Sequence, residues 1–157
     1  MQTNILNSPH GGYESATDSR NAGLVAWAAL VGRIGLALIF LWSGYGKIMH
    51  VQETVGYMNA YHVPLASVLV WPAAIVELVG AAMLVTGWKA RGAALLLAAY
   101  SILSALIFHN FWAVPADQAL NQTIHFMKNV AIMGGLLQIC AFGAGRYAVA
   151  PQKETMQ

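Results

Sequence analysis

The sequence predicts an all-α integral membrane protein, a bundle of four transmembrane helices. Of its 157 residues, 58% are hydrophobic and only 9% are charged, whereas soluble domains average about 25% charged residues. The mean hydropathy of +0.57 agrees. At about 20 residues per span, four spans with short loops fit this length. The net charge of +2 is small and scattered, which favours a lipid bilayer over nucleic acid as partner.

The chain divides into one membrane domain and two polar tails. Residues 1–22 carry neither the positive start nor the short apolar run of a signal peptide, so we expect a flexible cytoplasmic N-terminal tail. Residues 23–145 form the four-span domain, and residues 146–157 form a cytoplasmic C-terminal tail. Apolar runs place the spans at about residues 24–45, 65–88, 92–108 and 124–143.

The first span contains glycines that favour close helix packing, and a segment with two tyrosines follows it. Gly32, Gly35 and Gly44 allow a second helix to approach closely, which leaves a homo-oligomer open as an alternative. Tyr57 and Tyr61 then follow at helical spacing in a mixed segment. Tyr is enriched at membrane interfaces, so we expect a short interfacial helix there.

The other spans have polar boundaries. The second ends at Trp88, and a tight turn leads into the third. His109 ends the third span, and the polar residues 113–122 form an outer loop before the fourth.

The distribution of Lys and Arg predicts the orientation. Four spans place both termini and the middle turn on one side, and five basic residues lie there against one, Lys47, outside the spans on the other. Positive residues are enriched on the cytoplasmic side. We therefore expect a multi-pass protein of the bacterial inner (plasma) membrane with both termini cytoplasmic. The five are Arg20, Lys89, Arg91, Arg146 and Lys153.

Charged side chains interrupt three of the spans, and they indicate a buried polar site. Arg33, Glu77 and Lys128 lie within apolar runs, where each charge costs roughly 2.5–3.5 kcal/mol on insertion scales. Counted from the span starts, Arg33 and Glu77 both fall near the bilayer centre, so an Arg33–Glu77 ion pair is expected. Such a pair could equally fix helix register alone, and Lys128 could extend to the interface.

Further polar groups fall near the outer boundary of the same helices. We predict a polar pocket that opens outward, with the charge pair at its floor. Histidines on adjacent spans lack the His-x3-His spacing of a metal site, so no metal is predicted. The single cysteine, Cys140, cannot form an intrachain disulfide. No catalytic residue is assigned, and the pocket residues are Arg33, Lys47, Glu77, His109, Asn110, His125, Lys128 and Asn129.

Four segments, in order, resemble the DoxX family of small bacterial membrane proteins. They are GRIGLALIFLWSGYGKI (residues 32–48), PAAIVELVGAAMLVTGWKAR (72–91), FHNFW (108–112) and HFMKNVAIMGGLL (125–137). The resemblance implies a four-helix inner-membrane protein. Members of that family take part in membrane-associated redox and thiol-stress complexes, which implies such a role here.

Three functions fit these observations. The first is a membrane subunit of a redox or thiol-stress complex whose pocket binds quinone, with His109, Lys128 and Asn129 as hydrogen-bond donors. No haem, flavin or cluster pattern is present, so a soluble redox partner protein would supply the electrons. The second is a non-catalytic membrane anchor or assembly factor, and the third is a small carrier.

Overall fold

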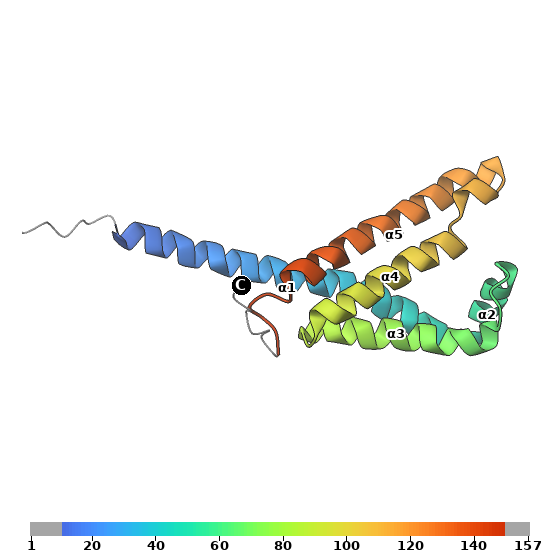
Figure 1. Ribbon diagram of the computed structural model, residues 1–157, viewed down its shortest axis with the longest axis horizontal. Helices are drawn as coiled ribbons and strands as arrows, with labels where there is room; N and C mark the ends of the chain where they lie inside the picture. The colour runs from blue at the N-terminus through green and yellow to red at the C-terminus, as the bar shows by residue number, and fades with distance from the viewer. Residues whose placement is uncertain (1–10, 150–157) are drawn as a thin grey trace, which may run out of the picture.

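The computed structural model describes residues 11–149 and is helical almost throughout (Figure 1). Within this range, four helices are long and apolar enough to cross a membrane. The all-α, four-span prediction is therefore confirmed. The elements in chain order are α1 (Gly11–Met49), α2 (Val51–Ala60), α3 (Ala66–Thr86), α4 (Ala90–Phe108), the short 3-10 helix η1 (Phe111–Ala113) and α5 (Ala116–Phe142).

Two helices extend well beyond the spans that hydropathy indicated. Helix α1 has 39 residues, roughly 58 Å at 1.5 Å per residue, about twice the thickness of a hydrocarbon core. Residues 11–22 of the expected flexible tail are therefore helical. The first half of α1 projects from the bundle (Figure 1). Residues 1–10 lie outside the described part of the chain.

Helix α5 begins at Ala116 rather than near Ile124, so most of the expected outer loop is helical. Pro115 precedes its first turn and Asp117 lies within that turn. Both features favour a helix start, because proline needs no hydrogen-bond partner there and the carboxylate interacts favourably with the helix dipole. Hydropathy marks only the apolar part of such a helix.

A short helix between the first two spans is confirmed as α2. Its Tyr57 ring lies 5.0 Å from that of Tyr61 and 5.5 Å from that of Phe108 at the end of α4. This aromatic cluster holds α2 against the end of the bundle, where Figure 1 shows it beside the start of α3.

The bundle is built from two closely packed helix pairs, α1 with α3 and α4 with α5, joined by contacts between α3 and α4. Small residues form much of the core, among them Ala37, Ala81 and Ala94, with leucines between them. Small side chains let helix backbones approach closely, and dispersion contacts then stabilise the packing in a membrane.

Large apolar side chains cover the outside of the bundle instead of its interior. Trp42, Val68, Leu103 and Phe142 are more than half exposed. Four helices with such surfaces imply contact with a lipid bilayer.

The chain after α5 turns back along one end of the bundle. The Val149 N–H donates to the Thr86 carbonyl at 2.9 Å, and the Tyr147 ring lies 5.3 Å from that of Trp27. Part of the expected C-terminal tail therefore packs against α1 and α3, while residues 150–157 lie outside the described range.

Arg33 lies at this same end of the bundle and not, as the sequence predicted, at the depth of Glu77. Its guanidinium lies beside Gly87, directly after α3, whereas Glu77 is ten residues earlier, roughly 15 Å away along the helix. The expected Arg33–Glu77 pair is therefore wrong. The predicted depth of Arg33 assumes that the first span starts at Leu24, but α1 begins at Gly11.

Gly87 is required by the backbone and by its neighbours. Its φ of +77° is a left-handed conformation, and an added Cβ would lie against the Arg33 guanidinium and 2.7 Å from the Ala148 Cβ. We expect Gly87→Ala to lower stability by about 1–3 kcal/mol. Thermal unfolding in detergent measures this. Gly92→Ala is the control, since its added methyl meets no atom within 4 Å, and equal melting of the two variants would contradict the assignment.

Candidate ligand-binding site

An ion pair inside the bundle joins α1 to α3. The Lys47 Nζ lies 2.9 Å from Oε2 and 3.0 Å from Oε1 of Glu77. Ser43, one turn before Lys47, donates to Glu77 Oε1 at 3.0 Å and accepts from Lys47 Nζ at 2.7 Å. The side chains of Lys47 and Glu77 are 19% and 4% exposed. Glu77 therefore has its partner on the helix stripe that also carries Arg33, but nearly four turns further along.

Gly44 permits this contact. A Cβ on Gly44 would lie 2.8 Å from Leu78 Cγ and 3.2 Å from Glu77 Cβ. Because α3 approaches α1 so closely here, the Glu77 carboxylate reaches both Ser43 and Lys47. The sequence showed Gly44 as a small residue for helix packing, and the structure shows which helix it admits.

Arg33 lies apart from this network. Its side chain is buried, and Nη2 donates to the Tyr147 carbonyl. Within the described part of the chain, Nε and Nη1 have no hydrogen-bond partner. Arg33 therefore ties the returning C-terminal segment to α1 and does not belong to the pocket that the sequence predicted.

Six of the eight predicted residues line one cavity of about 560 Å³, called here the α5 cavity. It lies between α1, α3, α4 and α5. Apolar walls come from Ile39, Phe40 and Ile132. Its other polar lining residues are Ser43, Tyr100, Ser101 and Ser104, and the six predicted ones are Lys47, Glu77, His109, His125, Lys128 and Asn129.

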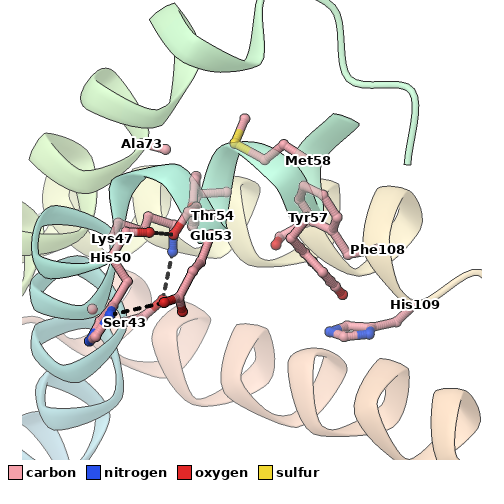
Figure 2. A pocket seen from close by; sticks show the side chains of 13 residues that line it. Ser43, Lys47, His50, Glu53, Thr54, Tyr57, Met58, Ala73, Phe108 and His109 are labelled. Atoms are coloured by element: carbon pink, nitrogen blue, oxygen red, sulfur yellow. Dashed lines mark hydrogen bonds and ion pairs between the residues drawn. The ribbon is translucent and has the colours of Figure 1, made fainter. Parts of the chain in front are cut away.

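A second cavity of about 450 Å³, the α2 cavity, lies between α1, α2 and α4. It shares five lining residues with the α5 cavity, so the two adjoin at the ion pair. Figure 2 shows Lys47 and Ser43 at one side of the α2 cavity and Phe108 and His109 at the other. The shared residues are Ser43, Lys47, Tyr100, Ser104 and His109.

The two histidines form a stacked pair across α4 and α5. Their rings lie 5.0 Å apart at 18°, and His109 Nδ1 lies 2.9 Å from Gln122 Oε1. In the described range, no third His, Cys, Asp or Glu joins them in a group that could hold a metal ion. Both rings line the α5 cavity, where imidazole nitrogens can donate or accept hydrogen bonds.

The remaining predicted residues have varied surroundings. Asn129 donates to the His125 carbonyl of its own helix at 3.0 Å, and Lys128 is exposed. Asn110 lines neither cavity, and its carbonyl accepts from Ala113 in η1.

Sequence reasoning did not include Ser43 and Tyr100 in the site. Ser43 precedes Lys47 by four residues, and Tyr100 precedes Ser104 by four, so each shares a helix face with a polar partner. This spacing is the signal that identifies them. A cavity with several donors, one carboxylate and apolar walls suits a ligand with a small polar head and an apolar body.

The ion pair should be strongly coupled. Removal of one partner leaves a buried charge, so we expect Glu77→Met or Lys47→Met to destabilise the fold by about 3–5 kcal/mol. The double variant Lys47→Met/Glu77→Met should recover most of that loss. Unfolding of all four proteins in detergent completes the double-mutant cycle.

The exposed contact between His50 and Glu53, at 3.6 Å, supplies the control. Glu53→Gln should change stability by no more than about 0.5 kcal/mol. Additive effects of the two single changes at Lys47 and Glu77 would show that the pair is not coupled.

Comparison with known proteins agrees with this architecture. The DoxX family profile matches residues 28–110. The inner membrane protein YphA of Escherichia coli is 33% identical over 116 residues, which cover 74% of this chain and 83% of YphA. The inner membrane protein YqjF of the same bacterium is 32% identical over 120 residues, covering 76% and 87%.

A more distant match is the Surfeit locus protein 4 homolog of Schizosaccharomyces pombe, 29% identical over 82 residues, which cover 51% of this chain and 27% of that protein. No solved structure matches the chain significantly. The family match spans more than half of the chain and includes the helices that carry Lys47, Glu77 and Tyr100. This four-span membrane protein belongs to the DoxX family.

Proposed function

We propose that this protein is an inner-membrane subunit of a redox or thiol-stress complex and that the α5 cavity binds quinone. The observation that carries the proposal is the Lys47–Glu77 pair, which forms part of the wall of a cavity within the membrane-spanning helices. Intramembrane charges of this kind are expensive and usually functional. The names of YphA and YqjF, both inner membrane proteins, support the location.

The lining residues match what a quinone needs. Its two carbonyl oxygens accept hydrogen bonds, and the ammonium of Lys47 and the hydroxyl of Tyr100 can donate them. Phe40 and Ile132 offer an apolar wall for the ring. Glu77 holds Lys47 in place and balances its charge. A soluble redox protein would then exchange electrons with the bound quinone.

A structural role for the pair is the second candidate. Lys47 and Ser43 on α1 and Glu77 on α3 meet where Gly44 brings the two helices together. An anchor or assembly factor would need nothing more from these groups than helix register.

Quinone binding tests the first candidate. In nanodiscs, quenching of the native tryptophan fluorescence reports the affinity for added ubiquinone. We expect Tyr100→Phe to weaken binding about tenfold, because it removes one donor and almost no volume. Tyr45→Phe is the matched control, since Tyr45 is on α1, exposed, and lines neither cavity. Absence of saturable quenching in the unmodified protein would remove quinone from the proposal.

A charge swap separates the two candidates. Lys47→Glu combined with Glu77→Lys keeps an ion pair between α1 and α3 but exchanges the positions of the cation and the carboxylate. If the pair serves helix register alone, the swapped protein should keep normal stability, and quinone binding should not differ from that of the unmodified protein. A quinone site predicts a folded protein with weakened binding, because the cation then extends from α3.

We also propose that both termini face the cytoplasm. The basic residue Lys89 lies in the turn between α3 and α4, and Arg91 follows in the first turn of α4. Basic residues at such a connection favour the cytoplasmic side. Alkaline phosphatase fused after Val149 should be inactive, whereas green fluorescent protein at that site should fluoresce. Reporters inserted after Val114, in the loop before α5, should give the opposite pattern. Active phosphatase at Val149 would reverse the assigned orientation.

A further inference from the structure

The two outer helices α1 and α5 touch at one end and separate toward the other. A Cβ on Gly135 of α5 would lie 3.2 Å from Leu36, and one on Gly145, in the segment that follows α5, would lie 3.1 Å from Ala29. Beyond these contacts α5 diverges from α1 in Figure 1, and the two helices share few contacts overall. The two helices therefore separate beyond Leu36, which leaves a lateral gap lined by residues of the α5 cavity.

The α5 cavity lies along this gap. Ile39 on α1 and Ala131 on α5 are both exposed and both line the cavity, so the cavity meets the outer surface between them. Exposed large apolar side chains neighbour these two residues along their helices: Leu38 precedes Ile39 on α1, and Met127 lies about one turn before Ala131 on α5. A surface of this composition faces lipid tails.

The α2 cavity has an opening of another kind. His50 and Glu53 are among its lining residues, and their side chains are 64% and 83% exposed. Figure 2 shows both on the α2 side of the cavity. The two cavities adjoin at Lys47, so one polar site has two openings. The opening between α1 and α5 is bordered by apolar side chains and by the exposed Lys128, and the other opening is bordered by His50 and Glu53.

We propose that the gap between α1 and α5 is a lateral portal through which a lipid-soluble ligand enters, and through which its apolar chain extends into the bilayer while its polar head lies at Lys47. This inference rests on the proposed quinone site and specifies how a tailed quinone occupies it. The α2 cavity supplies water to the polar head. A chain leaving toward α2 would instead pass charged and aromatic groups.

Narrowing the portal tests the inference. Ala131→Phe places a ring in the opening and leaves every polar lining residue unchanged in sequence. In nanodiscs, we expect the affinity for decylubiquinone to fall by at least about tenfold, because the bound chain and the new ring compete for one space. Affinity for the same quinone head without a tail should stay within about twofold. Leu137→Phe is the control, because Leu137 is on the same helix, is exposed and lines neither cavity. This variant should change neither of the two affinities.

The outcomes separate the two proposals. If neither quinone binds the unmodified protein, the proposed function is wrong. If both bind and Ala131→Phe leaves the tailed quinone unaffected, the site stands and the portal is wrong. If Ala131→Phe abolishes the binding of both quinones, a second variant, Ile39→Phe, tests the portal by narrowing the opening from α1. A tail-specific loss there supports the portal, and any other result overturns it.

Discussion

A carboxylate within membrane-spanning helices needs a partner from the protein, and Glu77 finds two on α1. Lys47 neutralises its charge and Ser43 donates a further hydrogen bond. The side chains of Glu77 and Lys47 are both largely buried, so each group would be costly alone. The position of α3 against α1, and with it the polar wall of both cavities, depends on this network.

Small residues make the network geometrically feasible. Gly44 lets α3 approach, and Gly80 accepts the Leu97 side chain, which would lie 2.9 Å from an added Cβ. Close approach at these points draws α1, α3 and α4 together. Helix α5 packs mainly on α4 and leaves α1 beyond Leu36, so the cavity follows from uneven packing of four helices.

The two ends of the bundle differ in polar organisation. At one end, Arg33 holds the Tyr147 carbonyl, and Val149 pairs with Thr86, so the returning chain closes the helix ends. At the other end, polar side chains of α1, α2, α4 and α5 surround two adjoining cavities. The closed end maintains the helix arrangement, and the open end offers room for a ligand.

The sequence by itself determined the four apolar helices, the short helix α2 and the polar character of His109, His125 and Lys128, because hydropathy and helical spacing are local properties. It did not determine that Lys47 rather than Arg33 pairs with Glu77. Both cations lie on one stripe of α1, and only the register of α3 chooses between them. Helix ends were also misjudged, since a helix can continue past its apolar segment. Tertiary packing alone decided these features, because they depend on distances between helices.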